Sequence, residues 1–259
     1  MTRTKFFIPF VIVLALTLLL GAALIALTVK GDTDKPSPDN PMPAEDTVPT
    51  AIFKADLAEF EKYMDVNDEK YLVLVNKTNT VDQGFVPEEL ITVADATKSI
   101  KLSKTAEMAL EAMFREMRTQ GFTNVYVTSA YRDYSNQNNL FFNIYIPQEM
   151  ATGLSYEKAM EKVLTYSAYP GTSEHHTGLC VDLMTTSMRE LDESFADEAV
   201  YPWLLENAWK FGFILRYPED KTEITGYSFE PWHYRFVGRY HAYKIHSQGL
   251  CLEEYLEIK

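Results

Sequence analysis

An uncharged apolar segment near the N-terminus, residues 6–29, constrains this chain more than any other feature. A helix of that length reaches about 36 Å, enough to cross a hydrocarbon core about 30 Å thick. A secretory signal has a shorter apolar region of about 7–15 residues, and no convincing cleavage site follows this segment. We therefore predict one retained transmembrane anchor over residues 6–29, with a long, cleaved signal peptide as the alternative.

The charges beside this segment predict its orientation. Arg3 and Lys5 precede it, and the positive-inside rule keeps such a short basic end in the cytoplasm. Residues 1–5 are therefore predicted to be cytoplasmic, and the rest of the chain to lie outside the cell membrane. Lys30 and Lys35 on the far side weaken the argument, although acidic residues surround them.

Residues 30–50 have the composition of a linker. They hold five of the 12 prolines, together with several acids and few large apolar residues. Proline lacks a backbone donor and favours extended conformations, so this stretch is predicted to be a solvated, semi-stiff tether. Residues 51–259 then form one globular domain of ordinary size.

The overall composition excludes several classes of protein. The formal net charge of −13 argues against a nucleic-acid partner, because phosphate recognition needs a surplus of Lys and Arg. Two cysteines cannot form a disulfide framework or a Cys-rich zinc module. A hydrophobic content of 46%, with 13% aromatic residues, is too high for a disordered chain.

Helical and strand patterns alternate irregularly through the globular part, which favours an α+β fold over a doubly wound sheet. An amphipathic helix is predicted over Ser103–Gln120, with Gly121 in position to end it. Another helix is predicted over Ser155–Leu164, with Ser155 as its N-cap. Strands are predicted at 71–75, 125–129, 179–184 and 213–217.

Two polar stretches near the C-terminal end contain the residues for metal-assisted hydrolysis. His175 and Asp182 could bind one ion if Gly178 allows the backbone to fold between them. His233 could supply a third ligand, and Glu230 could act as the general base. Catalytic zinc sites use three protein ligands and keep one position open for water, which this set would satisfy.

The spacing of Glu230 and His233 imposes a condition on the backbone. Positions i and i+3 face opposite sides of a regular strand. The two side chains can share a site only if the chain bends between them, and Pro231 is a plausible cause of that bend.

The motif S-x-H-x-x-G-x-x-x-D over residues 173–182, followed by E-P-W-H over 230–233, resembles the VanY-type D-alanyl-D-alanine carboxypeptidases. These belong to a group of zinc peptidases that includes lysostaphin-like enzymes and the hedgehog signalling domain. The resemblance extends to residues 129–132 with Gln137, to Asn76 and Lys77, and to residues 249–256. It therefore spans most of the globular part.

The resemblance implies a fold, a metal site and a set of active-site residues. The fold would be a small α+β domain, with a zinc site on an antiparallel sheet flanked by helices. Zinc would be bound by His175, Asp182 and His233, with Glu230 as base and Arg132 polarising the scissile carbonyl. The residues implied on the substrate side are Ser129, Tyr131, Gln137, Ser173 and Trp232.

The implied activity is removal of the C-terminal D-Ala from peptidoglycan stem peptides, by a D,D-carboxypeptidase held at the membrane. Two alternatives stay open: an L,D-carboxypeptidase acting on tetrapeptides, and a non-catalytic peptidoglycan-binding or sensor domain. Glu230 argues against the sensor, because a structural zinc site has no use for a spare base. Nothing in the sequence indicates an oligomeric state.

Several neighbours of the motif have more than one interpretation. His176 is expected to be structural and Glu174 to be a solvated loop charge. Cys180 replaces the small residue usual in the family and has the same strand parity as Asp182. It could be a buried thiol, a disulfide partner of Cys251 or a zinc ligand, in that order. Tyr131 and Trp232 could line the cleft or belong to the core.

Overall fold

A computed structural model describes residues 47–258 of the chain. The predicted cytoplasmic end, the predicted anchor over 6–29 and almost all of the 30–50 linker lie outside the described residues. Within 47–258, no helix combines the length and the apolar composition that crossing a membrane requires. The prediction of an anchor therefore stays a prediction.

A four-stranded antiparallel sheet forms the centre of the domain, with the strand order β3-β4-β6-β5. Its strands are β3 (Val125–Ser129), β4 (Cys180–Thr185), β5 (Phe213–Leu215) and β6 (His233–Phe236). A separate antiparallel pair joins β1 (Leu90–Thr92) to β2 (Lys101–Ser103). The strands β4 and β6 are therefore neighbours at the middle of the sheet.

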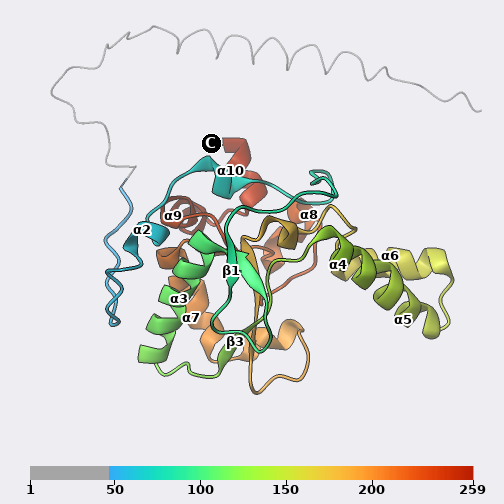
Figure 1. The fold of residues 1–259 in the computed structure, drawn as a ribbon, viewed down its shortest axis with the longest axis horizontal. Coiled ribbons are helices and arrows are strands. Elements are labelled where there is room, and N and C mark those ends of the chain that lie inside the picture. The colour runs from blue at the N-terminus through green and yellow to red at the C-terminus, as the bar shows by residue number, and fades with distance from the viewer. Residues whose placement is uncertain (1–46, 259) are drawn as a thin grey trace, which may run out of the picture. The chain divides into compact units, whose positions relative to one another are not determined.

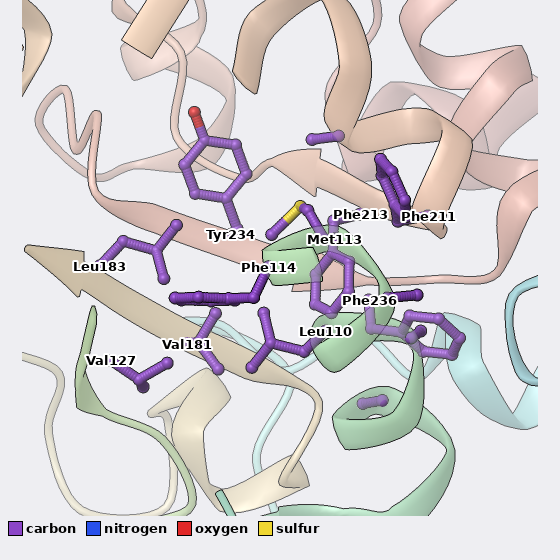
Figure 2. Packing of buried hydrophobic residues seen from close by; sticks show 14 of the residues in the cluster. Leu110, Met113, Phe114, Val127, Val181, Leu183, Phe211, Phe213, Tyr234 and Phe236 are labelled. Atoms are coloured by element: carbon purple, nitrogen blue, oxygen red, sulfur yellow. The ribbon is translucent and has the colours of Figure 1, made fainter. Parts of the chain in front are cut away.

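The two faces of β4 and β6 differ in chemistry, because successive residues of a strand point to opposite faces. One face packs against the helix α3 (Lys104–Thr119), as Figure 2 shows. The side chains of β4 and β6 on this face are all apolar or aromatic: Val181, Leu183, Tyr234 and Phe236. The alternate residues are Cys180, Asp182, His233 and Arg235.

The helix α3 follows the predicted pattern closely. Its apolar face supplies Leu110, Met113 and Phe114 to the main core (Figure 2). Ser103 stands at its N-cap, although the Ser103 side chain makes no capping hydrogen bond. Gly121 follows the C-terminal end with a φ of 94°, a left-handed conformation that glycine adopts without strain.

The remaining helices surround this centre (Figure 1). They are α2 (Glu61–Met64), η1 (Glu69–Leu72), α4 (Tyr134–Asn138), η2 (Asn139–Tyr145, a π-helix), α5 (Ile146–Ala151), α6 (Tyr156–Tyr166), η3 (Glu174–Thr177), η4 (Glu193–Asp197), α7 (Val200–Asn207), η5 (Ala208–Phe211), η6 (Glu219–Lys221), α8 (Thr222–Thr225), α9 (Arg239–Gln248) and α10 (Leu252–Ile258). The described part of the chain thus combines small antiparallel sheets with many helices, which confirms the predicted α+β class.

The helices α4, α5 and α6 project together from the side of the domain (Figure 1), and with η2, which joins α4 to α5 in the chain, they form an arm. The arm has a small core of its own, formed by Phe141, Ile146, Ala159 and Val163. The predicted cap of α6 is present, because the Ser155 side chain accepts a hydrogen bond from the backbone N–H of Lys158.

The predicted strand at 71–75 is wrong. Residues 69–72 instead form the 3-10 helix η1. The carbonyl oxygens of Tyr71 and Val73 accept hydrogen bonds from Nη2 of Arg235, each at 2.9 Å. A buried arginine therefore satisfies backbone groups that a strand would offer to a neighbouring strand.

Candidate active site

The three predicted metal ligands lie together at the polar face of β4 and β6. Nε2 of His175 lies 3.2 Å from Oδ2 of Asp182. Nδ1 of His233 lies 3.1 Å from Oδ1 of the same carboxylate. All three side chains are buried. The residues separated in the sequence thus converge on one small volume.

Strand register and one glycine produce this convergence. Asp182 pairs with His233 across the β4–β6 ladder, which places both side chains on the same face. The short helix η3 ends at Gly178, whose φ of 63° is left-handed. The chain then turns into β4 with His175 beside Asp182, as the sequence predicts.

Each imidazole has one nitrogen held by the protein and one facing the cluster. Nδ1 of His175 lies 2.6 Å from the carbonyl oxygen of Ala130. Nε2 of His233 lies 3.0 Å from Oε2 of Glu174. Such partners fix the orientation of an imidazole and leave the other nitrogen available to a metal.

The predicted bend between Glu230 and His233 is present. The backbone N–H of His233 donates to the carbonyl oxygen of Glu230 at 3.2 Å, which closes a turn with Pro231 at its second position. Oε2 of Glu230 consequently lies 3.5 Å from Nδ1 of His233. Pro231 has the role that the sequence suggests.

The electrostatics of the cluster favour a bound cation. Burial alone would lower the pKa of His175, but the neighbouring Cys180 and Asp182 raise it to about 9. Burial opposes ionisation of Asp182, yet the two imidazoles hold its pKa below the usual range. Without a metal, protons on the imidazoles balance the carboxylate, and a metal cation could take the place of those protons.

At Glu230 the effect of burial on the pKa prevails, in contrast to Asp182. Burial raises the pKa of this carboxyl to about 7, only partly opposed by His233, and the charge of Asp182 adds to the rise. A carboxyl with a pKa near neutrality can both accept and return a proton at physiological pH. Glu230 therefore has the properties of a general base.

The donor set fits a transition metal such as zinc. Imidazole nitrogens and a carboxylate oxygen are ligands that zinc takes in catalytic sites. Oδ1 of the buried Asp182 accepts no hydrogen bond from the residues that the structure describes. An unpaired buried oxygen is costly, and a metal ion would satisfy it. The Sγ of Cys180 lies in the same cluster, within 4.8 Å of a ring nitrogen of His175 and of His233.

Arg132 lines this site, and hydrogen bonds to neighbouring side chains fix its guanidinium. Nη1 donates to Oε1 of Gln137 at 2.6 Å, and Nη2 donates to the hydroxyl of Ser129 at 3.1 Å. Gln137 is fully buried and its amide donates onward to the carbonyl of Ala168 at 2.6 Å. Ser129 and Gln137 therefore contact the arginine, and their predicted part in substrate binding would be indirect.

A pocket of about 400 Å³ opens over the cluster. Its lining includes the predicted metal ligands, Glu230, Arg132, Ser173 and Trp232. Tyr131, also predicted on the substrate side, is not among the described residues that line the pocket. Four tyrosines that the sequence analysis missed also line the pocket: Tyr145, Tyr166, Tyr217 and Tyr227. Two of them come from the arm, and no motif marks their position.

The prediction for Glu174 is wrong, because this residue is buried at the centre of an ion-pair network. Its Oε1 accepts hydrogen bonds from Arg216 at 2.8 Å and from Arg235 at 2.6 Å. Arg216 also forms a two-bond pair with Glu253 of α10. The positive charges of these two arginines thus explain how a carboxylate next to a predicted metal ligand can be buried.

The expectation for His176 is confirmed. Its Nε2 accepts a hydrogen bond from the backbone N–H of Gly171 at 3.1 Å, so Nδ1 carries the proton and donates to the carbonyl of Arg132 at 2.7 Å.

Both cysteines are buried and free, so the disulfide between Cys180 and Cys251 is not formed.

Comparison with known proteins agrees with this geometry. The family described as VanY, D-alanyl-D-alanine carboxypeptidase, matches residues 99–239. A D-alanyl-D-alanine carboxypeptidase of Enterococcus faecalis is 36% identical over 217 residues, covering 84% of this chain and 73% of the relative. The cluster of predicted metal ligands, the pocket and these matches define the class: the chain belongs to the VanY family of D-alanyl-D-alanine carboxypeptidases.

Solved structures give the same fold. A D,D-pentapeptidase VanY from a VanB-type resistance cassette, in complex with Zn(II), matches with a TM-score of 0.63 at 39% identity, covering 73% of this chain and 99% of the other. VanYB in complex with D-alanine-D-alanine matches with the same TM-score at 38% identity, covering 73% and 98%. The L,D-carboxypeptidase LdcB matches with a TM-score of 0.63 at 36% identity, covering 72% and 86%.

Proposed function

We propose that this protein is a zinc-dependent D,D-carboxypeptidase that removes the C-terminal D-Ala from peptidoglycan stem peptides. One observation carries the proposal: His175, Asp182 and His233 converge in a pocket in which Oε2 of Glu230 lies 3.5 Å from Nδ1 of His233. The zinc-bound and D-alanine-D-alanine-bound VanY structures, at 39% and 38% identity, support the metal and the substrate.

The residues divide the chemistry among them. A zinc ion held by the two imidazoles and Asp182 would supply Lewis acidity for the hydrolysis. Oε2 of Glu230 accepts a proton from the attacking water and returns it to the leaving amine as the peptide C–N bond breaks. Arg132 presents donors to the oxygen of the scissile carbonyl, on which negative charge develops.

The walls of the pocket fit a short peptide end. Tyr217 and Tyr227 stand together with their ring centroids 4.7 Å apart, and the ring of Tyr217 lies 4.9 Å from that of His233. Aromatic walls beside the proposed metal position keep bulk water away from the reacting bond, which strengthens the electrostatic effect of Arg132. A non-catalytic sensor domain would need neither the base nor this enclosure.

An L,D-carboxypeptidase is the second candidate, because LdcB matches the chain with the same TM-score as the two VanY structures. The metal site serves both reactions, and the pocket walls select the stereochemistry of the residue before the cleaved bond. Incubating the full chain in mild detergent with a D-Ala-D-Ala pentapeptide and with the corresponding tetrapeptide separates the two. Loss of one D-Ala from the pentapeptide alone is expected, and loss from the tetrapeptide alone would establish L,D activity instead.

The N-terminal segment completes the proposal. A single transmembrane anchor at residues 6–29 and a proline-rich linker at 30–50 would hold the enzyme at the membrane, on the cell-wall side. The uncharged run and the basic end before it support this arrangement. The full chain should sediment with membranes and be cut by protease added outside intact spheroplasts. A variant lacking residues 1–30 that still sediments with membranes would contradict it.

A further inference from the structure

The polar face of the sheet carries a fourth possible ligand that the proposed function does not use. Cys180 is the first residue of β4 and lies two positions before Asp182, so both side chains point to the same face. Its side chain is completely buried, and its thiol forms no disulfide. A sulfur atom therefore stands at the metal site, closed off from solvent.

The distances allow Cys180 to share an ion with the two imidazoles. The ligand atoms of His175, Cys180 and His233 all lie within 4.8 Å of one another. Zinc bonds of about 2.1 Å to nitrogen and about 2.3 Å to sulfur, at tetrahedral angles, place two ligand atoms of one ion about 3.4–3.6 Å apart. Small side-chain rotations that shorten these distances by at most about 1.4 Å would thus bring all three atoms to one ion.

A second observation, independent of the cysteine, marks the same volume as a ligand site. Oδ1 of Asp182 is buried and accepts no hydrogen bond from any residue that the structure describes, although Nδ1 of His233 lies 3.1 Å away. A carboxylate with an oxygen left without a hydrogen bond, beside two imidazole nitrogens, is an arrangement that a bound cation would complete.

We propose that Cys180 is a fourth protein ligand of the metal held by His175, Asp182 and His233. The inference rests on the proposed function for the presence of a metal, and adds one soft donor to it. On coordination the S–H bond breaks, its electron pair forms the bond to the metal, and the proton passes to solvent. Zinc accepts a fifth position in some sites, so four protein ligands leave room for water.

The sulfur gives this site a preference that nitrogen and oxygen ligands alone do not. Thiolates favour soft ions, whereas carboxylates favour hard ones. Cys180 should therefore raise the affinity of the site for cadmium more than its affinity for harder divalent ions. The other cysteine provides a matched control, because Cys251 is equally buried and its backbone N–H is bound to Glu254 near the C-terminal end.

Cobalt(II) spectroscopy of the full chain in mild detergent tests the proposal. Cobalt bound by imidazole and carboxylate gives visible d–d bands, and a thiolate ligand adds an intense ultraviolet charge-transfer band. We expect both in the wild-type protein and in Cys251→Ser, and loss of the ultraviolet band alone in Cys180→Ala. The cadmium affinity of Cys180→Ala should fall by at least about tenfold, in the range that changes around metal sites produce.

The outcomes are distinguishable. Wild-type d–d bands without a charge-transfer band would overturn the role of Cys180 and leave the proposed metal site intact. Absence of any cobalt bands in the wild-type protein would overturn both. A charge-transfer band that persists in Cys180→Ala would also overturn the proposal. Because the decisive spectrum is that of the wild-type chain, a variant that fails to fold does not remove the test, and Cys180→Ser offers a substitution of nearly the same size.

Discussion

Oε2 of Glu174 lies 3.0 Å from Nε2 of His233, and both side chains are almost completely buried. This contact fixes the ring of one proposed metal ligand, His233, and comes from the residue next in sequence to another proposed ligand, His175. The same carboxylate is held by Arg216 and Arg235. Its pKa is low because, although burial opposes ionisation, the two arginines favour it more strongly. Glu174 therefore stays charged and keeps His233 oriented.

We predict that Glu174→Gln lowers the affinity for zinc by about 10–100-fold, because a neutral amide orients the imidazole less firmly. Chelator competition on the full chain measures this affinity. Glu253→Gln is the matched control, since Glu253 pairs with Arg216 but is not among the residues bonded to His233. An equal loss of zinc affinity in both variants would show that the effect is a general loosening of the fold.

Arg132 yields a second prediction. Lysine cannot reproduce the fork that bonds Gln137 and Ser129 while presenting further donors to the substrate. Arg132→Lys should therefore lower kcat/KM for release of D-Ala by about 100-fold, as loss of one oxyanion donor does. Bound zinc, measured by atomic absorption, should stay at the wild-type level.

Gln137 should act through Arg132. Gln137→Leu removes the acceptor that holds Nη1, so we expect a reduced kcat/KM with normal zinc content. Asn136→Ala on the same helix α4 is the control, because Asn136 is exposed. Steady-state kinetics that leave Gln137→Leu indistinguishable from Asn136→Ala would contradict this role.

The buried carboxyl of Glu107 in α3 should make the stability of the protein depend on pH. Its Oε1 accepts a hydrogen bond from the backbone N–H of Ala94. Burial, together with the charges of Glu111 and Asp95, raises its pKa to about 7. The folded state then holds a proton that the unfolded state releases near its ordinary pKa of 4.5. The free energy of unfolding should therefore fall as the pH rises from about 4.5 through about 7, and level off above that.

Glu107→Gln should remove this contribution. The variant should gain stability relative to wild type at pH 8, by about 1–3 kcal/mol, and gain little at pH 4.5. Urea denaturation of both proteins at the two pH values measures the difference. A stability difference that is the same at both pH values would rule out Glu107 as its source.

Local sequence patterns predicted much of the fold. The apolar face of α3, Gly121 after it and the Ser155 cap of α6 depend on neighbours in sequence, and the structure has each of them. The apolar run at 71–75 has the local pattern of a strand but does not form one. The carbonyls of Tyr71 and Val73 accept hydrogen bonds from Arg235, more than 160 residues away, and no local pattern shows such a partner.

The candidate site divides in the same way. The convergence of His175, Asp182 and His233 was predictable because the joint motif resembles that of the VanY-type carboxypeptidases. The burial of Glu174 was not, since its two arginine partners lie 42 and 61 residues further along the chain. The tyrosines of the pocket are a similar case, because two of them reach it only through the placement of the arm.

The variant Glu230→Gln tests the role of Glu230 as the general base of a zinc-dependent hydrolysis, with zinc content and D-Ala release measured on the same sample of full chain. The substrate is a pentapeptide ending in D-Ala-D-Ala, and mass spectrometry follows the loss of the last residue. We predict normal zinc content and a rate reduced by at least about 100-fold, because the base is lost while the metal ligands remain. Release of D-Ala by Glu230→Gln at the wild-type rate would contradict the account.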